Sequence, residues 1–155
     1  MLYEPAAAAA ENGINPDSRL VTSEAPQAID DTEGGFLKVF DLAILDPNSN
    51  FNTGLSRYVV PANGDYFIAG YARFIALSGG TEMFVRLKKN GVSEIEFVVG
   101  WNPPAEGWRY GGCPLKLVTL TEGDYIDMWV ESYDAVEQEI PAGINNCGLV
   151  VLRVS

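Results

Sequence analysis

Histidine is absent from the 155-residue sequence. This absence excludes the Ser-His-Asp triad, the Cys-His pair and the usual zinc ligands, so acid-base catalysis would fall to carboxylates, Lys or Tyr. The acidic groups Asp30-Asp31-Glu33 and Asp124-Asp127 also lack the Asp-x-Asp-x-Asp-Gly spacing of a calcium loop, and we interpret them as solvated turns. We therefore expect a protein that is not an enzyme and that uses neither a metal nor a cofactor.

Basic residues and cysteines are also scarce. Ten Lys and Arg residues stand against 21 Asp and Glu residues, and the resulting net charge of -11 repels phosphate backbones, so we expect no direct nucleic-acid binding. The two cysteines, Cys113 and Cys147, belong to a chain that is large enough to fold without disulfides. Buried free thiols are favoured over a disulfide.

The first residues lack the features of a targeting segment. Residues 1–5 have neither the basic start nor the long apolar stretch of a signal peptide, and the alanines at 6–10 are too few to span a bilayer. We expect no secretion and no membrane partner.

Composition divides the chain near residue 35. Residues 1–34 contain seven acidic residues and one basic residue, a net charge of -6, whereas the other 121 contain fourteen and nine, a net charge of -5. The first segment has three prolines and only scattered apolar residues: Leu2, Tyr3, Ile14, Leu20, Val21 and Ile29. It cannot form a core alone, so it is either a disordered tail or an arm extended across another surface. We assign 1–34 to an extended N-terminal arm and 35–155 to the folded domain.

After residue 35, short apolar runs alternate with turn residues. The pattern predicts strands at about 36–45, 55–60, 65–75, 83–89, 94–100, 114–120, 124–132 and 148–154. Asn90-Gly91 favours a hairpin turn, because both residues tolerate positive φ. Eight strands with almost no helix signal predict an all-β fold, an antiparallel two-sheet jelly-roll sandwich.

Two of these strands are apolar on both faces. In 65–75, the alternation places Tyr66, Ile68, Ala72 and Phe74 on one face and Phe67, Ala69 and Tyr71 on the other. The last strand repeats this with Leu149 and Val151 against Val150, Leu152 and Val154. In the strand that begins at Asp124, by contrast, Ile126, Met128 and Val130 form the core face, and Asp127, Trp129, Glu131 and Tyr133 face the other way. A doubly apolar sheet in one small domain needs a cover, so the pattern predicts oligomerisation.

Several short motifs together resemble the jelly rolls of tumour necrosis factor and of the globular heads of complement proteins. The resemblance runs from about Phe36 to the C-terminus. Its motifs are Val39-Phe40-Asp41, Phe51-Asn52-Thr53, Tyr58-Val59-Val60-Pro61 with Gly64-Asp65-Tyr66-Phe67, Lys89-Asn90-Gly91, Leu120-Thr121-Glu122-Gly123-Asp124 and Cys147-Gly148-Leu149-Val150-Val151-Leu152. Each motif alone is weak, whereas their order and spacing agree with the family.

The resemblance implies a homotrimer in which the inner sheets meet around a three-fold axis. The matching positions are Phe67, Ala69, Tyr71, Cys113, Leu115, Val150 and Leu152. With no collagen-like stem, signal peptide or membrane anchor, the chain looks most like the decoration, or cement, proteins of tailed phages. The expected function is therefore that of a structural virion protein on the outer surface of the capsid, assembled in the host cytoplasm. Its partner is the major capsid protein, bound by the arm residues Leu2, Tyr3, Ile14, Leu20, Val21 and Ile29.

A second hypothesis comes from Trp101, Trp108 and Tyr110, which flank a Pro-rich segment. Aromatic loops of this kind hold sugars or peptides in many proteins, although packing over the end of a barrel is the more frequent role. The alternative function is a receptor- or glycan-binding head domain of a phage fibre or a bacterial lectin-like protein.

Overall fold

The computed structural model describes residues 19–22, 24–29, 36–38, 40–76, 83–100, 107–132 and 138–154. Within these residues all regular structure is β-strand. The strands are β1 (Arg19–Thr22), β2 (Gln27–Ile29), β3 (Phe36–Leu37), β4 (Leu42–Leu45), β5 (Phe51–Asn52), β6 (Arg57–Val59), β7 (Gly64–Ala76), β8 (Met83–Lys89), β9 (Ser93–Gly100), β10 (Gly107–Leu120), β11 (Tyr125–Ser132), β12 (Gln138–Ile140) and β13 (Cys147–Arg153).

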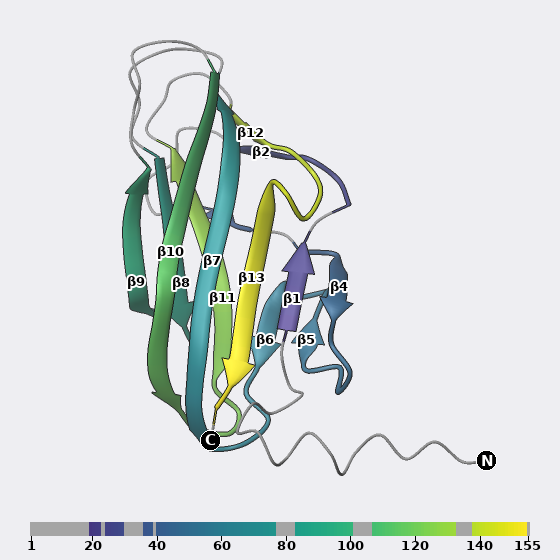
Figure 1. Cartoon of the computed structure of the whole chain (residues 1–155), viewed down its shortest axis with the longest axis vertical. Helices are drawn as coiled ribbons and strands as arrows, with labels where there is room; N and C mark the ends of the chain where they lie inside the picture. The colour runs from purple at the N-terminus through teal and green to yellow at the C-terminus, as the bar shows by residue number, and fades with distance from the viewer. Residues whose placement is uncertain are drawn as a thin grey trace, which may run out of the picture.

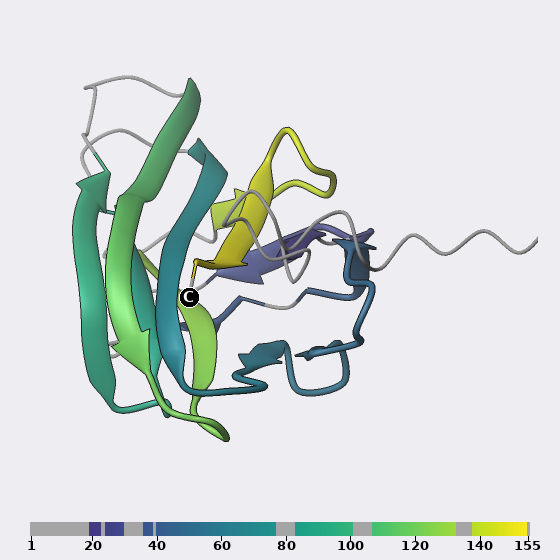
Figure 2. The same ribbon diagram turned by 60° about the horizontal axis from the view of Figure 1, so that its bottom comes forward.

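The strands form two antiparallel sheets that face each other (Figures 1 and 2). Sheet A has the order β2-β12-β7-β13-β1-β4, with β10 also paired to β7. Sheet B has the order β5-β6-β11-β8-β9, with β3 paired to β11. This arrangement confirms the predicted all-β jelly-roll sandwich.

The core between the sheets follows the predicted alternation. Tyr66, Ile68 and Phe74 of β7 are fully buried, as are Ile126 and Met128 of β11. Gly70 of β7 faces Met128, because a Cβ atom there would lie 2.8 Å from the Met128 sulfur. The core side of β7 is therefore closed by sheet B, and its other side is left to the outside of the sandwich.

Part of the predicted arm belongs to sheet A, so the predicted boundary at residue 34 differs from the structure. In β1, Leu20 lies opposite Val150 of β13 on one side and opposite Leu45 of β4 on the other. In β2, Ile29 is fully buried in the core. The acidic composition of residues 1–34 concealed these strands, because each is too short to show a period of its own.

A buried lysine fixes β2 to the sandwich. Lys38 is fully buried, and its Nζ donates to Gln27 Oε1 of β2 at 3.0 Å. Burial lowers the pKa of Lys38, and the neighbouring Cys147 and Asp41 oppose that shift. No pattern in the sequence indicates a charged side chain in the core.

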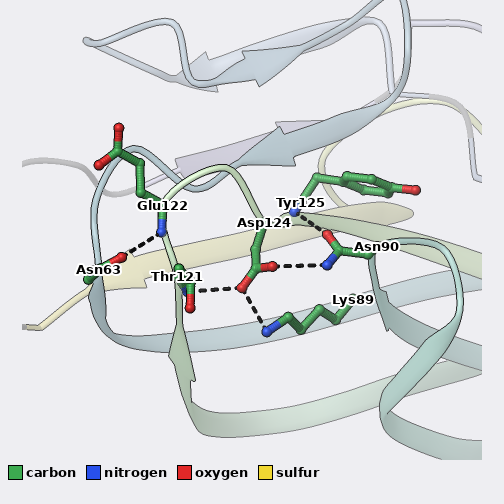
Figure 3. Close-up of polar contacts among 7 residues, drawn as sticks. All are labelled: Asn63, Lys89, Asn90, Thr121, Glu122, Asp124 and Tyr125. Carbon is green, nitrogen blue, oxygen red and sulfur yellow. Dashed lines mark hydrogen bonds and ion pairs between the residues drawn. The ribbon is translucent and has the colours of Figure 1, made fainter.

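A polar cluster at one end of the sandwich joins the β8–β9 turn to the turn before β11 (Figure 3). Asp124 accepts hydrogen bonds from Asn90 Nδ2 and the Thr121 N–H, both at 2.9 Å, and forms an ion pair with Lys89 at 2.7 Å. Asn90 and Gly91 have positive φ angles of 56° and 70°, as predicted for this hairpin. Partial burial raises the pKa of Asp124, but the hydrogen bonds and the Lys89 charge outweigh it and lower the pKa to about 2.

Candidate functional site

The face of sheet A that points away from sheet B is the candidate site, and we call it the open face. Strand register places its residues in rows, because paired residues in adjacent antiparallel strands share a face. Phe67 of β7 lies between Leu117 of β10 and Leu152 of β13. Ala69 lies opposite Val150 in the next row. Phe67, Ala69, Val150 and Leu152 are partly accessible, so the structure brings four of the predicted interface residues together on one outward surface.

Tyr71 occupies the centre of the next row, between two glycines. It pairs with Gly112 of β10 and with Gly148 of β13. Its ring lies over Gly148, and its hydroxyl donates a hydrogen bond to the Ile144 carbonyl oxygen. Burial raises the pKa of Tyr71, and Cys147 raises it further. The Tyr71 ring thus covers Gly148 on the open face.

Cys113 does not lie on the open face, contrary to the prediction. It is buried, and its Sγ donates to the Val85 carbonyl oxygen of sheet B at 3.3 Å. The cause is an irregularity between Cys113 and Lys116, where the pairing of β10 with β7 shifts. Strict alternation fails across such a bulge. Leu115, which lies inside it, is 57% exposed.

The open face extends beyond the predicted residues to both margins of sheet A. On β10, Leu117 is 53% exposed. On β4, Leu45 is 53% exposed and Leu42 is 37% exposed. Leu45 belongs to the row of Val150 and Ala69, through its register with Leu20. The apolar run of β4 is visible in the sequence, but its place beside β1 depends on pairing with a segment that the composition assigns to the arm.

The other predicted arm residues are divided between β1 and the chain outside the described residues. Val21 lies in β1 opposite Leu149. Leu2, Tyr3 and Ile14 lie outside the described residues.

The predicted aromatic loop is partly strand. Trp108 and Tyr110 belong to β10, opposite Ile75 and Arg73 of β7, whereas Trp101 lies outside the described residues. Tyr110 is 65% exposed, and the Arg73 guanidinium lies 5.3 Å from the centre of its ring. Tyr110 therefore extends the open face with an aromatic ring that has a cationic side chain beside it.

The outer face of sheet B is organised around Asp127, which sequence analysis placed on the outward face. Its neighbours along β11 are Tyr125 and Trp129, and its neighbours across the sheet are Arg57 and Lys88. Arg57 lies 4.0 Å from the Tyr125 ring centre, and Lys88 lies 3.9 Å from that of Trp129. Trp129 Nε1 donates to Asp127 Oδ1 at 3.0 Å. These side chains bury Asp127 to 2% exposure. The positive charges of Arg57 and Lys88, which lie against aromatic rings, balance the negative charge of Asp127 within this face.

Burial raises the pKa of Asp127, whereas the Trp129 hydrogen bond and the charges of Arg57 and Lys88 oppose the shift.

Farther along the same strand, Glu131 accepts a hydrogen bond from Arg86 Nε at 2.9 Å and is ion-paired to its Nη2 at 2.7 Å. Tyr133 lies outside the described residues.

Among the described residues, no group of three or more Cys, Asp or Glu side chains is placed to hold a metal ion. That part of the chain also contains no helix long and apolar enough to cross a membrane.

Neither cysteine forms a disulfide, and both are buried. Cys113 pairs with Gly70 and Cys147 with Ala72, so β7 lies between them. Two strand spacings separate their Cα atoms by about 9 Å or more, beyond the reach of a disulfide.

No protein-family model matches the chain, and neither does any curated protein. The fold is similar to that of the Eiger tumour necrosis factor from S. frugiperda, with a TM-score of 0.62 at 8% identity over 89% of this chain and 92% of that one. It is also similar to the globular domain of the zebrafish complement 1qA protein, with a TM-score of 0.55 at 17% identity over 88% and 94% of the two chains. At these identities the likeness shows a shared jelly-roll fold.

Proposed function

We propose that this chain is a structural protein that assembles into a homotrimer through the open face of sheet A. The observation that carries the proposal is the apolar surface formed by Phe67, Leu117, Leu152 and the rows beside them. A contiguous apolar surface of this kind on a monomer marks an interface. The three-fold arrangement is the one that the family resemblance implies.

We further propose that the trimer decorates the outer surface of a virus capsid and stabilises it. Three copies would each make a modest contact with the shell. Because the copies are joined in one trimer, the first contact would hold the other two copies near the shell at a high effective concentration. The net charge of -11 would keep decorated particles apart in solution. The attachment segment in this proposal is residues 1–18, which precede β1 and include the predicted arm residues Leu2, Tyr3 and Ile14.

The test is co-sedimentation of the full chain with purified capsids, beside a variant that lacks residues 1–18. We expect the full chain to sediment with the shells and the shortened chain to remain in the supernatant as a folded oligomer. Sedimentation of neither chain with any capsid type would count against decoration. Equal sedimentation of both would remove residues 1–18 as the attachment segment.

The alternative function, a receptor- or glycan-binding head, is favoured by one observation. Tyr110 is largely exposed with Arg73 beside its ring, an arrangement suited to a sugar that carries an acidic group. A glycan array with the full chain and with Tyr110→Ala tests it. A signal that depends on Tyr110 would support the binding head, and an array without signal would leave decoration as the better proposal.

A further inference from the structure

One side of the sandwich ends in an open edge. Sheet A ends at β4 and sheet B ends at β5, and Figure 1 shows both strands on the side opposite β9. On the β9 side the two sheets are joined, because Lys116 Nζ of β10 donates to the Ile95 carbonyl oxygen of β9 at 2.7 Å. No described strand pairs with the outer edge of β4, and β4 contains neither Lys nor Pro, which protect such edges in many proteins.

Four exposed aliphatic side chains lie on this side, and we call them the β4 patch: Leu42, Ile44, Leu45 and Leu55. Ile44 is 45% exposed and Leu55 is 52% exposed. Leu55 belongs to the turn between β5 and β6, and this turn is joined to the start of β4 because Ser56 Oγ accepts a hydrogen bond from the Phe40 N–H at 3.1 Å. The patch is therefore one surface that spans the edges of both sheets, and a concentration of this kind marks an interaction site.

Negative charges are held at both ends of β4. Asp41 directly precedes the strand, and its carboxylate accepts a hydrogen bond from the Glu24 N–H at 2.6 Å. Asp46 directly follows the strand, and its carboxylate accepts the N–H groups of Asn50 and Phe51, both at 3.0 Å. Residues 39–56 contain no basic residue. The β4 patch is thus an apolar surface with an acidic group at either end.

The nearest basic residues in the chain do not belong to this edge. Arg57 lies on the outer face of sheet B, 4.0 Å from the ring centre of Tyr125. Arg19 is the first residue of β1, and β1 is separated from the edge by β4. Two copies that paired through their β4 edges would bring the acidic ends together, which disfavours self-pairing. A partner with basic groups would be attracted instead.

We propose that the β4 patch binds an extended segment of another protein, one that carries aliphatic side chains and flanking Lys or Arg residues, as an added strand along β4. The pairing of β4 with β1 is irregular between Leu20 and Val21, so the added ladder is short. The aliphatic contacts and the charges of Asp41 and Asp46 therefore supply most of the selectivity. The inference goes beyond the proposed homotrimer and does not depend on it, because β4 lies three strand spacings, about 14 Å, from β7.

The test begins with short random peptides, selected on the full chain and counter-selected on a variant that carries Ile44→Ser and Leu55→Ser. We expect the selected peptides to share aliphatic residues flanked by Lys or Arg, and to bind the double variant at least about tenfold more weakly. The matched control is Val92→Ser, because Val92 is 83% exposed in the β8–β9 turn, and it should bind like the wild type. A selection without peptides that depend on the patch would overturn the proposal.

Two further changes test the charges and the added strand. Asp41→Asn should weaken binding of the selected peptide and reduce its dependence on salt, whereas Glu122→Gln, which removes a charge from the turn before β11, should do neither. Methylation of alternate main-chain nitrogens should abolish binding for the set that faces β4 and leave the other set unaffected. Equal effects of the two methylated sets would refute strand addition.

Sedimentation velocity separates this inference from the homotrimer. The Ile44→Ser, Leu55→Ser variant should keep the oligomeric state of the wild type. Its dissociation into folded monomers would assign the patch to a contact between copies and overturn the proposal. Displacement of the selected peptides by a synthetic peptide of residues 1–18 would also overturn it, because β4 would then be covered by this chain's own first segment. A monomeric wild type that still binds the selected peptides would defeat the homotrimer alone.

Discussion

The ring of Tyr71 occupies the space that a side chain at Gly148 would need. A Cβ atom on Gly148 would lie 2.6 Å from Tyr71 Cε1 and 2.6 Å from its hydroxyl oxygen. The hydroxyl is anchored beyond Gly148 on the Ile144 carbonyl, so the ring cannot move aside without losing that hydrogen bond. The position of the Tyr71 ring on the open face therefore depends on the lack of a side chain at Gly148.

Gly148→Ala should displace the Tyr71 ring. We expect a loss of about 1–3 kcal/mol in the free energy of unfolding, the usual cost of overpacking. Urea denaturation of the chain measures it, and Tyr71→Phe is the control. Phe keeps the ring and removes only the hydrogen bond, so its cost should be about 1 kcal/mol. Equal stability of Gly148→Ala and the wild type would show that the ring is not held where the structure places it.

Asp124 predicts a stability change in acid. Its pKa in the folded chain is about 2, below the ordinary value of 3.8 for this carboxyl group, so the carboxylate stabilises the fold above pH 3.8. That contribution should fall as the pH drops from 3.8 toward 2. Asp124→Asn should lower the Tm by a few degrees at pH 7, about 1 kcal/mol or less for a solvent-screened site, with a smaller difference near pH 2.

Thermal melts between pH 2 and pH 7 test this, with Glu122→Gln as the control. The Glu122 backbone N–H, rather than its side chain, bonds to Asn63, so the control removes a charge from the same turn without touching the cluster. A Tm difference for Asp124→Asn that is constant across this range would contradict the role of the carboxylate.

Asp127→Asn, which removes the charge, should destabilise the fold less than Asp127→Ala, which also removes the hydrogen-bond acceptor. Its raised pKa means that the folded state favours the protonated form, a contribution that is present below pH 3.8 and lost as the pH rises through the folded value. Asp127→Asn keeps an acceptor for Trp129 Nε1 and should cost less than about 1 kcal/mol at pH 7. Asp127→Ala leaves Trp129 Nε1 without this acceptor and should cost about 1–3 kcal/mol. Urea denaturation followed by tryptophan fluorescence measures both, and the reverse order would refute the hydrogen bond as the larger contribution.

The cysteines should behave as inert thiols. We expect two alkylations by iodoacetamide in denaturant and none in the native state, because both side chains are buried. Mass spectrometry of the alkylated chain gives the count directly. An intrachain disulfide would require Cys113 and Cys147 to cross β7, and its detection would contradict the register of β10 and β13.

The sequence allowed the inner strands to be predicted but not the edges. The alternation in β7 and β11 is long enough to determine which face is core, and Phe67, Ala69 and Tyr71 were placed correctly for the same reason. β1 and β2 are four and three residues long and depend on tertiary pairing, so composition alone assigned them to an arm. The bulge that turns Cys113 inward has no local signature apart from Pro114. The place of the exposed Leu42 and Leu45 of β4 on the open face depends on β1, which lies between β4 and β13.

The outer face of sheet B shows a different limit. Asp127 and Glu131 alternate as solvent-facing residues should, yet both are buried by side chains on the same face. The sequence pattern indicates that Asp127 lies on the outer face of sheet B. It does not indicate which side chains lie beside Asp127, because Arg57 and Lys88 come from strands that are distant along the chain. The raised pKa of Asp127 could not be inferred without them.

Sedimentation velocity of the purified wild-type chain over a wide concentration range tests the central claim most directly, with Phe67→Arg as the comparison. The account predicts a wild-type species of three times the 16.8 kDa chain mass, and a folded monomer for Phe67→Arg, which places a charge at the centre of the open face. A wild-type chain that stays well folded and monomeric at the highest concentration would contradict it.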